Sequence, residues 1–158
     1  MLHTDDVSAT WYIAWKKSWV FAYVSTPAIT TITVGNTYYP VAWTFTNAVI
    51  ENFTAVWTPA IRYDWSATQY FEVDRHATVK TNHNSCTVSI WIKKWWTLVA
   101  GSEMTTLCKT ALEHYNISWT CVVSLATNNE IQLVVTADTN GDEVTCDYFT
   151  TTINEFFD

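Results

Sequence analysis

Three stretches near the C-terminal end of the chain alternate apolar and polar residues with a period of two. Their apolar positions are Ile117, Trp119, Cys121, Val123 and Leu125, then Ile131, Leu133, Val135 and Ala137, then Val144 and Cys146, after which the phase shifts to Phe149 and Ile153. Successive side chains of a strand point to opposite faces of its sheet, so each stretch is predicted to be a half-buried strand. Asn128-Asn129 and Asn140-Gly141 separate the stretches and supply the left-handed φ values that tight hairpins need. Segment 117–153 therefore predicts an antiparallel meander with one face on a core.

Shorter strands are predicted upstream of this meander. They cover residues 19–24, 29–34, 38–41, 49–56, 61–63, 70–80, 86–92 and 104–110. About ten short, closely spaced strands without a convincing helix predict an all-β sandwich or barrel. Residues 1–18 show no sustained period, so we expect an N-terminal arm or linker there and a single domain over residues 19–158.

The phase of the alternation also predicts the core. The residues expected to be mostly buried are Phe71, Val73, Val79, Val88, Ile90, Trp119, Val123, Leu125, Leu133, Val135, Val144 and Ile153. The assigned register makes Leu133 face inward, whereas inward-facing Gln132 and Val134 would show that it is wrong.

Composition excludes several classes of protein. The chain has 158 residues, of which 49% are hydrophobic and 15% charged, as in one globular domain. A net charge of −7 argues against a nucleic-acid backbone or an anionic membrane as partner. No run of apolar residues reaches the length of a membrane span, and the N-terminus, with Asp5 and Asp6, does not resemble a signal peptide.

Four cysteines raise the question of disulfide bonds. Cys86, Cys121 and Cys146 fall in the apolar phase of their strands, and Cys108 alternates with Met104. A free cysteine at such a position behaves as a small buried hydrophobic residue. With no export signal, buried thiols are predicted in preference to bridges.

Candidate chemistry is sparse. The acids of segment 138–143 (DTNGDE) suggest a calcium loop but lack EF-hand spacing, and a hairpin turn with solvated acids is the simpler interpretation. His76 and His83 do not share a face, so they do not predict a zinc site. Cys108 and His114 are the only imaginable nucleophile and base, and a packing role for the cysteine is favoured. We therefore expect no catalytic residues, no metal and no cofactor.

A resemblance to a known family is carried by patterns of strands and turns. Segments 70–73 (YFEV), 87–90 (TVSI) with Lys93-Lys94, 122–135 (VVSLATNNEIQLVV) and 144–149 (VTCDYF) resemble tumour necrosis factor-like and complement-head-like jelly rolls. Segments 30–41 (TTITVGNTYYPV) and 98–102 (LVAGS) are similar to the versions found in tailed-phage virion proteins. The resemblance implies a single ten-stranded jelly roll, usually trimeric, that serves in capsid decoration, head fibres or fibre tips.

This resemblance sets the functional expectation. It implies a non-enzymatic virion structural protein that forms a homotrimer and docks onto capsid or tail components after assembly in the host cytoplasm. In such jelly rolls the outer face of the inner sheet makes the three-fold contact. On the assigned register that face carries Tyr70, His76, Thr120, Val122 and Tyr148. A carbohydrate-binding module, possibly one that recognises a host glycan at a fibre tip, remains the alternative, because exposed aromatic rings suit sugars.

The chain holds 10 tryptophans and only 3 glycines. Glycine averages about 7% in globular proteins, and a chain with many turns needs at least that. Trp91 and Trp119 lie inside clear strands, where a large aromatic residue is at home. Five others stand where turns are expected, namely Trp43, Trp57, Trp65, Trp95 and Trp96.

Two explanations of these tryptophans stay open. They are surface aromatics gathered for a partner or glycan, or one codon translated here as tryptophan is read as glycine by the organism. We favour the second, which accounts for the excess and the deficit together. It predicts positive φ at Trp65 and at Trp95 or Trp96, with no room for an indole.

Overall fold

The computed structural model describes residues 19–57 and 60–156. The arm predicted for residues 1–18 lies outside the described residues, and the first strand begins at Trp19. Within the described part no helix is long and apolar enough to cross a membrane.

The described chain is built from strands alone, joined by turns. In order they are β1 (Trp19–Thr26), β2 (Ile29–Ile32), β3 (Tyr39–Pro40), β4 (Thr44–Glu51), β5 (Phe53–Trp57), β6 (Ala60–Tyr63), β7 (Gln69–Thr81), β8 (Cys86–Lys94), β9 (Thr97–Leu98), β10 (Met104–Cys108), β11 (Tyr115–Leu125), β12 (Glu130–Ala137) and β13 (Asp142–Glu155). The single strand predicted for 49–56 is two strands, because Asn52 adopts φ +59° and turns the chain between β4 and β5.

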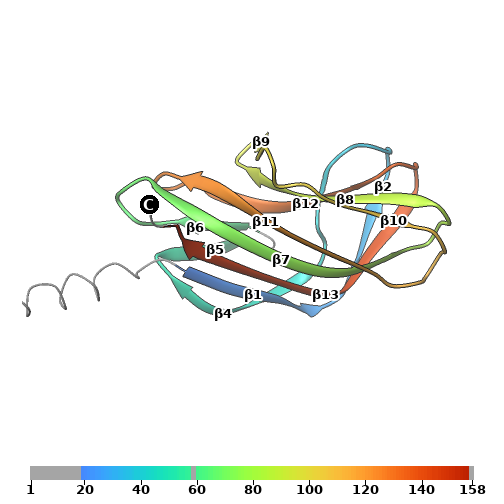
Figure 1. Ribbon diagram of the computed structural model, residues 1–158, viewed down its shortest axis with the longest axis horizontal. Helices are drawn as coiled ribbons and strands as arrows, with labels where there is room; N and C mark the ends of the chain where they lie inside the picture. Colours follow the sequence, from blue (N-terminus) through green and yellow to red (C-terminus); the bar gives the residue numbers. More distant parts are fainter. Residues whose placement is uncertain (1–18, 58–59, 157–158) are drawn as a thin grey trace, which may run out of the picture.

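The strands form two antiparallel sheets packed face to face (Figure 1). Sheet A has the order β11-β7-β13-β1-β4, with β2 also paired to β13. Sheet B has the order β10-β8-β12-β6-β5, with β3 paired to β12 and β9 to β8. Strands adjacent in space are mostly far apart in sequence, as in a Greek-key arrangement, which confirms the predicted all-β sandwich.

The turns predicted at Asn128-Asn129 and Asn140-Gly141 are present. Asn128 has φ +66° and Gly141 has φ +81°, the left-handed values that asparagine and glycine tolerate best. Gly35 meets a different constraint, because a Cβ there would lie 2.6 Å from the Asp138 carbonyl oxygen. The predicted antiparallel meander is wrong, because β11 and β13 belong to sheet A and β12 to sheet B, so these turns carry the chain from one sheet to the other.

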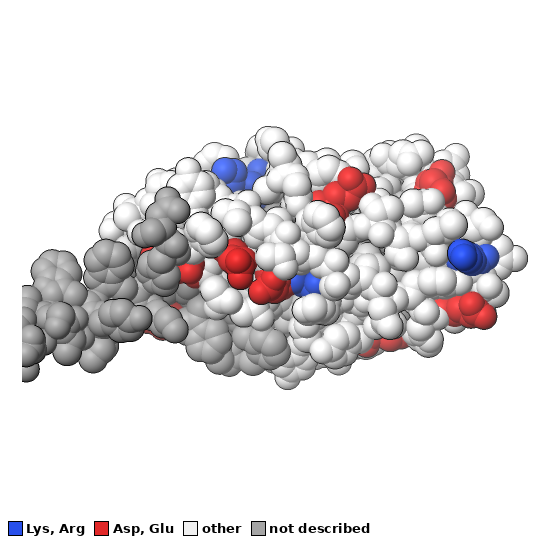
Figure 2. Space-filling model, in the orientation of Figure 1, with Lys and Arg blue, Asp and Glu red and all other residues white. Residues whose placement is uncertain are grey.

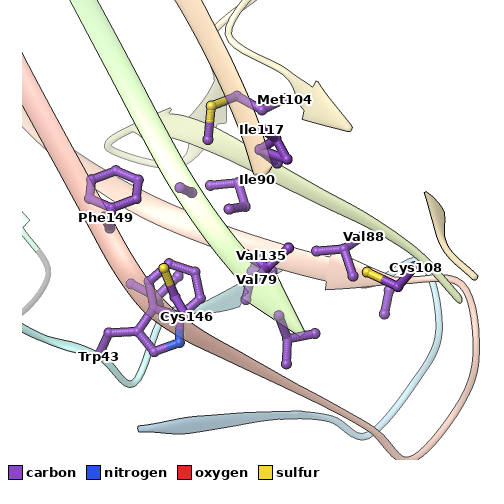
Figure 3. Packing of buried hydrophobic residues seen from close by; sticks show 14 of the residues in the cluster. Trp43, Val79, Val88, Ile90, Met104, Cys108, Ile117, Val135, Cys146 and Phe149 are labelled. Atoms are coloured by element: carbon purple, nitrogen blue, oxygen red, sulfur yellow. The ribbon is translucent and has the colours of Figure 1, made fainter. Parts of the chain in front are cut away.

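The core lies between the sheets and forms two clusters. The larger contains Trp43, Val79, Ile90 and Phe149, whose side chains point into the space between the sheets (Figure 3). The smaller is centred on the aromatic rings of Phe53, Tyr63 and Phe71, which contact one another in tilted and edge-to-face arrangements. All four cysteines are buried free thiols, as predicted.

Ten of the twelve predicted core residues are buried, and the two exceptions have physical causes. Trp119 has the inward phase but is 50% exposed on β11, the edge strand of sheet A, where its indole nitrogen donates to the Gly101 carbonyl oxygen. Leu133 packs inward against the larger cluster but is only partly buried. Val134 is also buried, on the other face of β12, where it lies between Pro40 of β3 and Trp91 of β8 in the same sheet. The predicted register of β12 is therefore correct.

Candidate functional site

The outer face of sheet A carries the five residues predicted to form a subunit contact. Strand β7 presents Tyr70 and His76, β11 presents Thr120 and Val122, and β13 presents Tyr148, and all five are exposed. Tyr70, Val122 and Tyr148 are 58%, 45% and 56% exposed. We call this surface, together with Tyr23 of β1, the outer A face.

The strand register explains why these side chains share one surface. Val122 pairs with Glu72, Thr120 with Asp74, and Ser118 with His76, so the even-numbered residues of β7 and β11 point outward together. The hydroxyl of Thr120 donates a hydrogen bond to the Asp74 carboxylate. Figure 2 shows this side of the molecule as mostly uncharged, with a small group of acidic side chains near its middle.

An ionic cluster borders the outer A face beside Tyr148. The Asp147 carboxylate lies 2.9 Å from Lys80 Nζ and 2.5 Å from His114 Nε2. The hydrogen bond from Lys80 is the main reason why the pKa of Asp147 is lowered, and His114 adds to it. Asp147 is the extra residue of a bulge in β13, since Cys146 and Tyr148 pair with consecutive residues of β7.

Tryptophans gather at one end of sheet B, around the β11–β12 turn. The Trp95 indole nitrogen donates to the Asn128 carbonyl oxygen at 3.3 Å, and the Trp65 carbonyl oxygen accepts from the Thr127 hydroxyl at 2.6 Å. Trp65 and Trp95 are 39% and 55% exposed. Trp96 is 89% exposed, with Lys93 Nζ 5.7 Å from its ring centroid. We call Trp65, Trp95 and Trp96 the tryptophan end.

The φ angles give the two explanations of the tryptophans different support. Trp95 has φ +52°, as the glycine explanation predicts, but Trp65 is not among the residues with positive φ. The prediction of positive φ is therefore wrong at Trp65. Trp43 is fully buried and packs on Phe149 at a ring distance of 6.2 Å, so an indole fits the core at that position. The side chain of Trp57 lies outside the described residues.

Segment 138–143 forms the predicted turn with Asp138 exposed, but the prediction of solvated acids is wrong for Asp142. Asp142 is fully buried, accepts a hydrogen bond from the Cys86 thiol at 3.1 Å, and contacts the His83 imidazole. The ligand atoms of Cys86, Asp138 and Asp142 lie within 4.8 Å of one another. The Thr87 amide donates to Asp138 at 3.1 Å, so internal hydrogen bonds account for this cluster.

The structure does not bring Cys108 and His114 together as a nucleophile and base. His114 pairs with Asp147, whereas Cys108 is fully buried beside Cys86 in the β8–β10 ladder. Burial raises the pKa of both thiols, and Asp142 raises that of Cys86 further. Burial also raises the pKa of Cys146 to about 12. A thiol that keeps its proton at neutral pH is a poor nucleophile.

Sequence reasoning missed Arg75. It lies between Val73 and Ala77 in the inward phase of β7 and is only 1% exposed. Burial lowers its pKa. The signal was present, because an arginine in the inward phase of β7 interrupts the apolar series of Phe71, Val73, Ala77 and Val79.

Comparisons with known proteins identify the fold. No family model matches the chain, and no curated protein matches it in sequence. Among solved structures, it is similar to Eiger TNF from S. frugiperda, with a TM-score of 0.56, 9% identity, and coverage of 87% of this chain and 93% of that one. Murine APRIL at pH 5.0 gives a TM-score of 0.56 at 8% identity, covering 86% of this chain and 98% of that one.

The globular domain of zebrafish complement 1qA protein is similar as well. Its TM-score is 0.55 at 8% identity, and the match covers 90% of this chain and 100% of that one. At such identities the likeness establishes the fold and nothing more specific. The chain is an all-β, two-sheet antiparallel sandwich with the jelly-roll fold of tumour necrosis factor and C1q domains.

Proposed function

We propose that this protein is a non-enzymatic structural protein of a phage virion that acts as a homotrimer and docks onto capsid or tail components. The observation that carries the proposal is the outer A face. It exposes Tyr23, Tyr70, Val122 and Tyr148 on the outer surface of sheet A, whereas the inner surface of the same sheet packs on the core. Exposed apolar side chains gathered on one sheet are typical of a surface that binds a protein.

The homotrimer follows from the fold and from the composition of this face. Jelly rolls of the family that the sequence resembles are usually trimeric through the corresponding sheet. Tyrosines and a valine from four strands form a surface of mixed polarity, which suits assembly of a protein that also folds as a monomer. A closed three-fold ring would bury the same face on every subunit.

The virion role rests on the sequence resemblance of segments 30–41 and 98–102 to tailed-phage proteins. The non-enzymatic role is supported by the cysteines, whose thiols are buried and protonated, and by the separation of Cys108 from His114. Surface complementarity alone would then be the mechanism.

Two measurements test this proposal. Sedimentation of the purified protein should give the mass of three chains, and a mass of one chain at high concentration would contradict the trimer. Proteomics of purified particles should find the protein at a copy number divisible by three. Its absence from particles would contradict the virion role and leave the trimer intact.

A second candidate function, carbohydrate binding, is favoured by the tryptophan end. Trp65 and Trp95 contact the same turn and are both partly exposed, with Trp96 beside them. Aromatic faces of this kind stack on sugar rings. A glycan array should then give binding signals that Trp96→Ala abolishes. Trp119→Ala, a change outside the tryptophan end, should leave these signals unchanged.

A further inference from the structure

A cavity of about 220 Å³ lies between the two sheets. Its walls are mainly aliphatic and aromatic, and they include Phe45, Val56, Ile61, Ile131, Leu133 and Ile153. One charged side chain, Arg75 from sheet A, also lines it. On the side of β12 away from β8, residues up to Gln132 pair with β6, and Val134 and Val135 pair with β3. The cavity therefore lies where the chain neighbouring β12 changes.

Arg75 has donors that nothing in the described structure uses. Its Nη2 atom donates to the Ser102 carbonyl oxygen at 2.5 Å and to the Cys121 sulfur at 3.8 Å. Its Nε and Nη1 atoms have no hydrogen-bond partner, although the residue is 1% exposed. Among the described residues no carboxylate forms an ion pair with it. The guanidinium keeps its charge in proteins, so this is a buried cation without a counter-ion.

The unused donors of Arg75 call for an explanation. Buried polar groups in native proteins are almost always satisfied, and exceptions call for a ligand, an ion or a functional role. A buried cation with two unused donors that lines a mainly apolar cavity indicates a missing acceptor, and its charge indicates that this acceptor is anionic.

We propose that this cavity binds a small carboxylic acid with an apolar body, such as a medium-chain fatty acid. Arg75 donates to the carboxylate, and the aliphatic walls cover the chain. An engineered cavity of about 150 Å³ accommodates benzene, so this one has room for a chain of about eight carbon atoms. The site is distinct from the outer A face and from the tryptophan end, so it does not depend on the function proposed above.

Calorimetric titration of the purified full-length protein with octanoate tests the proposal. Octanol serves as the neutral probe of equal length, and acetate as the head group alone. Octanoate should bind about 10- to 100-fold more tightly than octanol, the range expected for hydrogen bonds to a charged group. Acetate should bind too weakly to detect, because it leaves the apolar walls uncovered.

Two variants separate this site from a general attraction of anions to the protein. Arg75→Met should remove the preference for octanoate over octanol. Lys80→Met, which deletes a cation on the outer face of the same strand, should keep it. Ala22→Leu narrows the cavity while retaining Arg75, so it should weaken octanoate binding even if Arg75→Met fails to fold.

Several outcomes would overturn the proposal. Equal affinity for octanoate and octanol would remove the role of the guanidinium. Acetate or chloride binding as tightly as octanoate would show that the site takes inorganic or minimal anions. If Lys80→Met weakened octanoate binding as much as Arg75→Met, the preference would be a general attraction of anions and the proposal would be overturned. The absence of octanoate binding at millimolar concentration would overturn it as well.

Discussion

Val122→Asp is the substitution that most directly tests the outer A face. Val122 is 45% exposed in the single chain and lies directly opposite Glu72 on β7. If this face is the three-fold contact, the valine becomes buried on assembly. An aspartate there would place a second carboxylate beside Glu72 in a contact from which water is excluded.

The expected loss of assembly free energy follows from the burial of Val122 and from the charge that the aspartate introduces. Burying a whole valine side chain contributes about 1.5–3 kcal/mol, so covering the exposed half contributes about 0.7–1.4 kcal/mol per subunit. An unpaired buried charge costs about 3–5 kcal/mol. With three copies per trimer, the free energy of assembly should weaken by about 10 kcal/mol or more. In the monomer the like charges lie in solvent, so folding should lose less than about 1 kcal/mol.

Sedimentation velocity over a concentration series measures the assembly, and chemical denaturation measures the fold. The wild type should sediment as three chains and Val122→Asp as one, with nearly unchanged stability at matched oligomeric state. Leu107→Asp is the matched control, because Leu107 is 47% exposed but lies on β10 of sheet B. A Val122→Asp variant that stays trimeric, or a Leu107→Asp variant that dissociates equally, would refute the assignment of this face.

Three further predictions concern stability, measured by chemical denaturation. Leu133→Ala should lower the free energy of unfolding by about 2 kcal/mol, the low end for a buried leucine, because Leu133 already lines a cavity. Leu125→Ala, at a fully buried site, should lower it by about 3–5 kcal/mol. Trp95→Gly should stabilise the protein by up to about 1 kcal/mol, because glycine adopts φ +52° without the backbone strain that tryptophan has there. Trp65 does not have a positive φ, so Trp65→Gly should destabilise the protein by about 0.5–1 kcal/mol. Because the pKa of Asp147 is lowered on folding, its carboxylate stabilises the protein above the unfolded-state pKa, and this contribution is lost as the pH falls through the folded-state value. Asp147→Asn should therefore be less stable than wild type at neutral pH, by up to about 1 kcal/mol, and equally stable in strong acid.

Alternation in the sequence predicts β7, β11 and β12 correctly because each has one face on the core. In β7 every odd-numbered residue from Phe71 to Thr81 is buried, so the phase read from the sequence also places Tyr70 and His76 on the outer A face. A period of two fixes the face of a side chain without knowledge of the neighbouring strand.

Alternation cannot predict what depends on the neighbours. It does not show that β11 is an edge strand, which leaves Trp119 half exposed, or that Val134 lies between Pro40 and Trp91 of the neighbouring strands. The burial of Asp142 depends on the approach of Cys86 and His83 from the β7–β8 connection, far away in the sequence. Arg75 has the inward phase in the sequence, but only the packed sheets show that it lacks a carboxylate partner.

The tryptophans are where the side chains and the fold agree least. Trp95 pays a backbone cost at φ +52° that glycine would avoid, and Trp96 leaves 89% of its surface in water. The indole nitrogens of Trp43 and Trp91 are buried without a hydrogen-bond partner, although buried tryptophans usually find one. Trp119 has an inward phase that the edge of the sheet does not accommodate.

Unrelated positions share this mismatch between side chain and fold. A common origin in one misread codon explains it more simply than five separate functional reasons. Trp43 argues the other way, since its ring fills the core beside Phe149, so glycine there would open a cavity. Peptide masses covering residues 43 and 95 decide between the two at each position, because a misread codon gives glycine only where that codon stands.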